Sequence, residues 1–162
     1  MYRKGDKIVY PLYGAGVIEG IEEREIDGKI LTYYVLEIPV GNLRLSISTA
    51  NAESQRLRFV HQPDEVRSIL NEVANNTIEM PGNWSLRYKE NLERIKSGDL
   101  KTVALVFNTL LKRERLKGLS TAEKKMMTSI RQIIVSEIMI ALNFDKLSAE
   151  DYLSNTFKAG AI

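Results

Sequence analysis

The stretch Asn83-Trp84-Ser85-Leu86-Arg87-Tyr88-Lys89 divides the chain into two unlike parts. The residues before it show short alternating patterns typical of a small sheet, and the residues after it show helical periodicity. Trp84, the single tryptophan, stands at the start of an expected helix with Arg87 and Lys89 nearby. A large aromatic flanked by cations suits a wedge against a nucleic-acid duplex, because the cations hold phosphates while the ring stacks on a base.

A core position is the alternative interpretation of the tryptophan. A helix over this stretch would place four apolar or aromatic side chains on one face: Trp84, Tyr88, Leu92 and Ile95. Both interpretations remain open at this point.

The composition is that of a globular chain. Its 162 residues are 44% hydrophobic, enough for one typical domain or two small ones. The absence of cysteine excludes disulfides, thiol catalysis and thiolate metal sites. The first residues run directly into a polar, strand-like pattern with no signal peptide and no membrane span, so we expect a soluble, cytoplasmic protein.

The net charge of +2 conceals an uneven distribution. Residues 1–60 hold eight Lys or Arg and eight Asp or Glu, and residues 61–82 hold one against four. Residues 83–144 hold twelve against six, a net charge of +6. A neutral first part joined to a basic second part suggests two partners, with a polyanion bound by the second part.

Five short strands are predicted in the first 60 residues. Apolar and polar residues alternate over 7–11, 17–22, 31–38 and 43–47, and a short strand is expected near 57–60. Gly14-Ala15-Gly16 is interpreted as part of the first hairpin turn, and Asp27-Gly28 as the second. Five strands with tight turns predict a small, strongly bent sheet of the SH3 or Tudor type.

The remaining residues predict an all-α bundle, which makes the chain an α+β protein. Helices are expected over 63–73, from 84 to the stop at Gly98, from the Asp99 cap to about 117, from Ser120 to about 142, and from Ser148 onward. Ser120 and Glu123 fit a capping box. The predicted domains are 1–60, a helix and linker over 61–82, and 83–162. The last four residues, 159–162, are expected to be poorly ordered.

Little in the sequence suggests catalysis. The single histidine, His61, has no carboxylate or serine at a diagnostic spacing and is interpreted as a solvated linker residue. No zinc, EF-hand or HExxH pattern is present, and the Gly14–Gly16 stretch precedes no helix that could hold a phosphate. We therefore predict a protein that is not an enzyme, with no catalytic residue, cofactor or metal.

Basic residues accompany the tryptophan in the helical part. Two of them, Lys112 and Arg113, lie near the end of one expected helix, and Lys124 and Lys125 begin the next. These four are predicted to form one basic rim that binds DNA phosphates together with Arg87 and Lys89.

Several motifs, in order along the chain, carry a family resemblance. They are Gly5-Asp6-Lys7-Ile8-Val9-Tyr10-Pro11, Gly14-Ala15-Gly16, Asn51-Ala52-Glu53, Asn83-Trp84-Ser85, Arg87-Tyr88-Lys89, Asn91-Leu92, Ser97-Gly98-Asp99, Gly118-Leu119-Ser120 and Glu123-Lys124. Together they resemble the CarD/CdnL family of bacterial transcription regulators over essentially the whole chain. The first part alone is also similar to the polymerase-binding module of the transcription-repair coupling factor.

The resemblance implies a two-domain factor. Its Tudor-like barrel would hold the RNA polymerase β subunit, and its helical domain would touch promoter DNA at the upstream edge of the transcription bubble. Trp84 occupies the family's wedge position, Arg87 and Lys89 match its phosphate contacts, and Lys124 matches another.

The resemblance also marks the barrel side of the chain. Arg24 matches a cation that faces the β subunit, and Ser46 stands where many members carry an arginine. Leu86 stands where some members carry a second arginine. We expect a monomer that binds polymerase and promoter DNA, with little sequence specificity and no membrane contact.

Two other functions compete with this expectation. A free-standing DNA-binding repressor would need a recognition helix rich in base-reading side chains, of which residues 84–97 offer few. A structural adaptor would bind two protein partners, and its basic rim would then be incidental.

Overall fold

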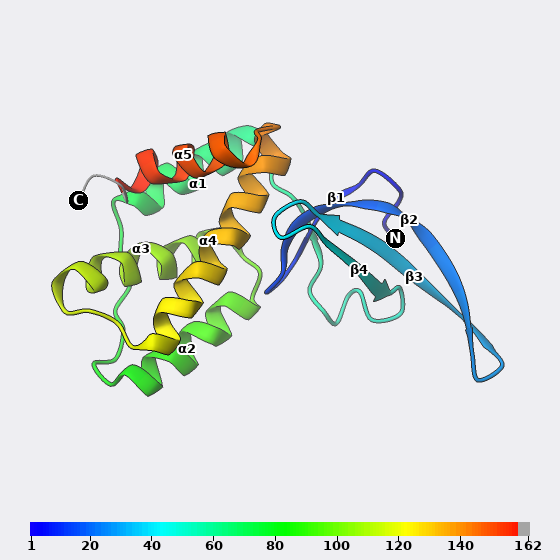
Figure 1. Cartoon of the computed structure of the whole chain (residues 1–162), viewed down its shortest axis with the longest axis horizontal. Helices are drawn as coiled ribbons and strands as arrows, with labels where there is room; N and C mark the ends of the chain where they lie inside the picture. The colour runs from blue at the N-terminus through cyan, green and yellow to red at the C-terminus, as the bar shows by residue number, and fades with distance from the viewer. Residues whose placement is uncertain (159–162) are drawn as a thin grey trace.

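The computed structural model describes residues 1–158, and the expectation for 159–162 lies outside the described residues. Five antiparallel strands come first: β1 (Lys7–Tyr10), β2 (Gly14–Ile26), β3 (Lys29–Ile38), β4 (Leu43–Ser48) and β5 (Arg58–Phe59). Their order in the sheet is β4-β3-β2-β1-β5. Five helices follow: α1 (Pro63–Ala74), α2 (Trp84–Lys96), α3 (Leu100–Leu116), α4 (Thr121–Leu142) and α5 (Lys146–Phe157). The predicted α+β class is confirmed, with a sheet and a bundle side by side (Figure 1).

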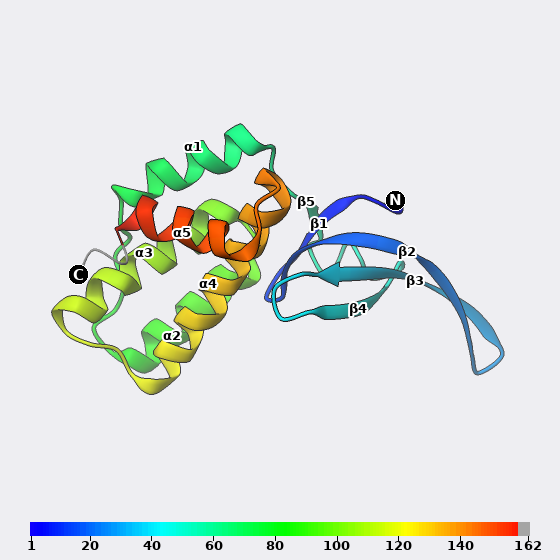
Figure 2. The same cartoon turned by 45° about the horizontal axis from the view of Figure 1, so that its top comes forward.

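The sheet curves around a small core of its own. This core consists of Ile8, Ile18, Tyr34, Leu36, Ile38, Ile47 and Ala52. The β2–β3 hairpin extends well beyond it and reaches away from the helices (Figures 1 and 2). At its tip Asp27 and Gly28 both have positive φ, 52° and 76°, as the Asp-Gly signal predicts for a tight hairpin.

Local signals define most helix ends as predicted. Ser120 and Glu123 form the predicted capping box, and the Asp99 side chain accepts a hydrogen bond from the amide of Thr102. The prediction for the last helix was wrong by two residues. It begins at Lys146 because the Asp145 side chain, 2.8 Å from the amide of Ser148, supplies an earlier cap.

Helix α1 is part of the bundle rather than a linker. Val66, Leu70 and Val73 are fully buried in the same core as the other helices. The segment after α1 is tied to α3, because the Asn108 amide donates to the carbonyls of Val73 (3.0 Å) and Asn76 (2.8 Å). Helix α1 and the segment after it therefore pack against the other helices.

The sheet and the bundle share one hydrophobic core. Four buried residues from the sheet side lie in the same cluster as the helical core: Val9, Ala15, Val40 and Val60. Helix α4 is the element that contacts β2, and its Ser136 Oγ accepts a hydrogen bond from the amide of Ala15 at 2.8 Å. The two parts are therefore joined by apolar packing as well as by the chain.

The structure corrects the interpretation of Gly14-Ala15-Gly16 as turn residues. The turn is Pro11–Tyr13, and the glycines belong to β2, where they face α4 and β3. Gly14 has φ of 125°, and a Cβ there would lie 2.7 Å from Ser136 Oγ. A Cβ at Gly16 would overlap the carbonyl of Glu37. The glycines are needed because other chain segments approach them closely.

Membrane-spanning potential is limited in the part of the chain that the structure describes. No single helix there is long and apolar enough to cross a bilayer, and only α4 with α5, bent by 112° at their junction, pass the length and composition test together.

Candidate nucleic-acid and polymerase interfaces

Trp84 is the first residue of α2, and its side chain faces solvent. Asn83 caps the helix, because its side chain accepts a hydrogen bond from the amide of Leu86 at 3.0 Å. Trp84 is 52% exposed and Leu86 49% exposed. The core interpretation of Trp84 is therefore wrong, and the tryptophan and leucine form an apolar tip at the start of the helix.

Arg87 does not lie on that exposed surface. It is 2% exposed, and its Nε and Nη2 donate to the two carboxylate oxygens of Glu123 at 2.6 and 2.8 Å. Its Nη1 donates to the carbonyls of Pro81 (3.0 Å) and Gly82 (2.9 Å). The predicted phosphate contact by Arg87 is contradicted, because its guanidinium is already bonded inside the protein.

Glu123, the partner of Arg87, is fully buried at the start of α4. Its carboxylate also accepts hydrogen bonds from the amide (3.2 Å) and hydroxyl (3.0 Å) of Ser120. Burial by itself raises the pKa of Glu123, but the hydrogen bonds from Arg87 and Ser120 outweigh burial and hold that pKa below its ordinary value. The pair therefore remains ionised and joins the first turns of α2 and α4.

Exposed cations lie near this end of the bundle. Lys89 is exposed on α2, and Lys124 and Lys125 are exposed directly after Glu123 on α4. Because Arg87 bonds Glu123, the structure brings these lysines to the same end of the bundle as Trp84. None of the three forms an ion pair among the described residues.

The four cations of the predicted rim lie on the two helices that flank the turn at residues 117–120, and the single rim stays a prediction. Lys112 is exposed and Arg113 half-buried, but α3 continues past both to Leu116. The next basic residue, Arg115, donates to the carbonyl of Lys158 at the end of α5. This end of α3 therefore lies beside α5, while Lys124 and Lys125 lie beside the start of α2.

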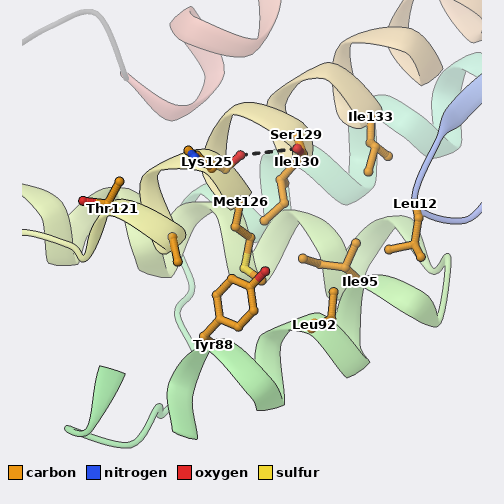
Figure 3. A pocket seen from close by; sticks show the side chains of 11 residues that line it. Leu12, Tyr88, Leu92, Ile95, Thr121, Lys125, Met126, Ser129, Ile130 and Ile133 are labelled. Atoms are coloured by element: carbon orange, nitrogen blue, oxygen red, sulfur yellow. Dashed lines mark hydrogen bonds between the residues drawn. The ribbon is translucent and has the colours of Figure 1, made fainter. Parts of the chain in front are cut away.

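An open groove of about 520 Å³ runs between α2 and α4 (Figure 3). Its apolar lining includes Tyr88, Leu92, Ile95, Met126, Ile130 and Ile133. Leu12, from the turn between β1 and β2, lies at one end of the groove, and Lys125 also lines it. The groove continues the helical face on which Trp84 stands, so aromatic and apolar surface extends along α2 from the exposed tip.

The outer face of the sheet brings together the two residues expected to bind polymerase. Arg24 on β2 donates to Ser46 Oγ on β4 at 2.7 Å. The same guanidinium lies 3.2 Å from the carboxylate of Glu22 and 4.8 Å from the centre of the Tyr33 ring. All four groups lie on the face opposite the small core, where Arg24 remains exposed.

Arg44 is a cation on this face that the sequence reasoning missed. Its side chain, 65% exposed, lies 3.0 Å from Glu19 and 3.6 Å from Glu22. The alternation along β4 could have identified it, since residues two apart on a strand share a face and Arg44 precedes Ser46 by two. Beyond it, the hairpin carries exposed apolar side chains: Ile21, Ile26, Ile30 and Leu31.

The junction between sheet and bundle contains a second buried ion pair. Arg58 on β5 donates to both carboxylate oxygens of Glu137 on α4, at 2.9 and 2.7 Å, and to the carbonyl of Gly98 at 2.7 Å. His61 is half-buried here and donates its amide to Glu137 at 3.2 Å, so it belongs to this junction rather than to a solvated linker. No local pattern predicted this pair, because its members are 79 residues apart along the chain.

Comparisons with known proteins assign both parts of the chain. Residues 2–61 match the family model of the CarD-like/TRCF RID domain, and residues 65–154 match that of the CarD C-terminal domain. The protein YdeB of Bacillus subtilis (strain 168), provisionally named a transcription factor, is 32% identical over 140 residues. This alignment covers 86% of the present chain and 92% of YdeB.

These matches define the class as a two-part transcription regulator whose sheet corresponds to an RNA polymerase-interacting domain. The chain belongs to the CarD family. The resemblance seen in the sequence motifs is thereby confirmed, as is the Tudor-like character of the sheet. The role associated with this family is regulatory rather than catalytic.

Proposed function

We propose that this protein binds the RNA polymerase β subunit through its sheet and stabilises the open promoter complex with Trp84 as a wedge at the upstream edge of the bubble. The observation that carries the proposal is the exposure of Trp84 at the start of α2, at the same end of the bundle as three lysines that form no ion pair within residues 1–158. The indole is 52% exposed, and DNA bound at this end of α2 would cover it.

The wedge would act because its binding differs between the two states of the promoter. Stacking of an aromatic ring on an unpaired base is worth about 1–3 kcal/mol. Since Trp84 would gain this energy only on open DNA, it would shift the equilibrium towards the open complex by roughly fivefold to a hundredfold. A contact made equally well to closed and open DNA would not change the equilibrium between the two complexes.

The cations would supply the sequence-independent part of the binding. Lys89, Lys124 and Lys125 are exposed and would hold phosphates near the tryptophan. Lys112 and Arg113 lie in the last turns of α3, next to the end of α5, and would contribute long-range attraction rather than contacts at the bubble edge. Few side chains on this surface can read bases, which favours binding without sequence specificity.

The polymerase contact would use the outer face of the sheet around Arg24 and Ser46. Here Arg24 is held in place by Ser46, Glu22 and Tyr33, so little side-chain freedom would be lost on binding. The attachment would raise the effective concentration of the helical part at the promoter, so that the DNA contact itself can be weak. The site of action would then be the bacterial cytoplasm, where the polymerase works, with the protein acting as a monomer.

The test measures the lifetime of open complexes on a promoter whose bubble collapses readily, with purified polymerase at fixed salt. Trp84→Ala should remove most of the lifetime gained with the wild-type protein and leave polymerase binding unchanged. Leu147→Ala removes a similarly exposed apolar side chain on α5, 71% exposed, and should leave the lifetime unchanged. An unchanged lifetime with folded Trp84→Ala would reject the wedge.

A second substitution tests the polymerase face. Arg24→Glu places a carboxylate beside Glu22 and removes the bond to Ser46, so association with the β subunit should be lost. Capture of polymerase at the wild-type level by a folded variant would contradict this assignment. A discrete DNA footprint without polymerase would favour the repressor, and polymerase binding without any salt-dependent DNA binding would favour the adaptor.

A further inference from the structure

A buried hydrogen-bond network lies at the start of α2, within three residues of the exposed tryptophan. It connects the carbonyls of Pro81 and Gly82, the guanidinium of Arg87, the carboxylate of Glu123 and the cap residue Ser120. We propose that Arg87 is a positioning residue that fixes the place and direction of Trp84, and that it is not a phosphate ligand. The consequence for DNA rests on the proposed function, whereas the effect on Trp84 itself does not.

The backbone on both sides of Trp84 is hydrogen-bonded, whereas its side chain is exposed. The indole is 52% exposed, so its direction depends on where the chain from residue 81 to residue 87 is held. Arg87 Nη1 bonds the carbonyls of the two residues that precede the Asn83 cap, and thereby fastens the entering chain to the first turn of α2. Nothing else in the described structure bonds these two carbonyls.

The other side of the guanidinium sets where this turn lies relative to α4. Its Nε and Nη2 form a bidentate ion pair with Glu123, whose carboxylate also completes the capping box with Ser120. Lys124 and Lys125 follow Glu123 directly. The pair therefore fixes the separation between the tryptophan and the lysines, and so the geometry with which the two could meet a strand fork.

Only arginine can form all of these bonds. Four hydrogen bonds leave the guanidinium in two directions, and its planar, forked shape supplies donors for both at once. A lysine ammonium keeps the charge, but it cannot donate two parallel hydrogen bonds to a carboxylate and also bond two carbonyls. Arg87→Lys therefore separates the role of the charge from the role of the shape.

The first experiment follows Trp84 in the free protein, where it is the only tryptophan. Time-resolved fluorescence anisotropy of Arg87→Lys should show a larger amplitude of fast local motion than the wild type. Arg58→Lys is the matched control, since it alters the other buried arginine-glutamate pair, at the junction with the sheet, and should leave the tryptophan motion unchanged. Wild-type motion in Arg87→Lys, or the same increase in both variants, would overturn the proposal.

The second experiment measures the salt dependence of binding to forked DNA. Arg87→Met combined with Glu123→Leu replaces the ion pair by apolar groups of similar size without changing the net charge. Affinity should fall while the slope of log affinity against log salt stays at the wild-type value, whereas Lys89→Ala should lower the slope by about one unit. A slope lowered by about one unit in the double variant would show that Arg87 contacts phosphate after all.

The two experiments fail independently. If Trp84→Ala leaves the open-complex lifetime unchanged, the proposed function is rejected, and the anisotropy of Arg87→Lys still decides whether Arg87 positions Trp84. If Arg87→Lys does not fold, the anisotropy of the apolar double variant replaces it, with the same expected increase in local motion. Unchanged anisotropy there would overturn the proposal.

Discussion

The ion pair between Arg58 and Glu137 offers a test of how the sheet is held on the bundle. The two side chains differ in their access to water, since the Glu137 side chain is 2% exposed and that of Arg58 is 24% exposed. Arg58 also has a second acceptor, the carbonyl of Gly98 at 2.7 Å, which does not depend on Glu137. Removing one partner should therefore cost more than removing the other.

The expected costs follow from what each substitution leaves behind. Arg58→Ala leaves a buried carboxylate without its cation, which should lower the free energy of unfolding by about 3–5 kcal/mol. Glu137→Ala leaves a guanidinium that keeps its bond to Gly98 and reaches water, so the loss should be about 1.5–3 kcal/mol. The double variant Arg58→Ala/Glu137→Ala buries no lone charge and should be no less stable than Arg58→Ala alone.

The assay is urea unfolding followed by far-ultraviolet circular dichroism for the wild type, both single variants and the double variant. Equal losses from the two single substitutions would refute the argument from burial. Strict additivity in the double variant would refute the coupling between the two groups, and with it the view that this pair fastens β5 to α4.

Two further predictions concern packing and acid stability. Gly16→Ala should lower the free energy of unfolding by about 1–3 kcal/mol in a thermal melt, because its Cβ would overlap the carbonyl of Glu37, whereas Gly20→Ala meets no atom within 4 Å and serves as the control. The pKa of Glu123 lies below its ordinary value of 4.5, so its stabilisation is present above pH 4.5 and is lost as the pH falls through the lower folded-state pKa. The urea concentration at the unfolding midpoint should therefore decrease as the pH is lowered below 4.5, and it should decrease less steeply in Glu123→Gln. Parallel pH profiles of the two proteins would contradict the assignment of this acid sensitivity to Glu123.

Local patterns predicted the elements well because their causes are local. The Asp27-Gly28 turn, the Asp99 cap and the Ser120–Glu123 capping box all depend on residues within a few positions of one another. The start of α5 was predicted at Ser148, three residues too late for its cap, because Asp145 caps the helix instead.

The burial of Arg87 was harder to predict because its partner lies 36 residues away. The sequence did contain a signal, since Arg87, Asn91 and Ile95 recur at the spacing of one helical face and all three are buried. Charge alone favoured solvent, and only the fold shows that a carboxylate on another helix compensates it. The contact between Arg24 and Ser46 likewise depends on the register of the sheet. The family resemblance singled out both residues, but the strand pattern did not predict that they touch.

The shared core limits where this chain can be truncated or joined to a domain of a relative. An isolated sheet domain ending near residue 61 would expose Val9, Ala15, Val40 and Val60, which are now covered by helices. A chimera that joins this sheet to the bundle of a relative must also supply a small residue or serine at position 136, since Gly14 and Ala15 fit closely against Ser136. The two family matches are thus separate in sequence but share a core in the structure. A soluble truncation would need polar residues on the sheet surface that α4 now covers.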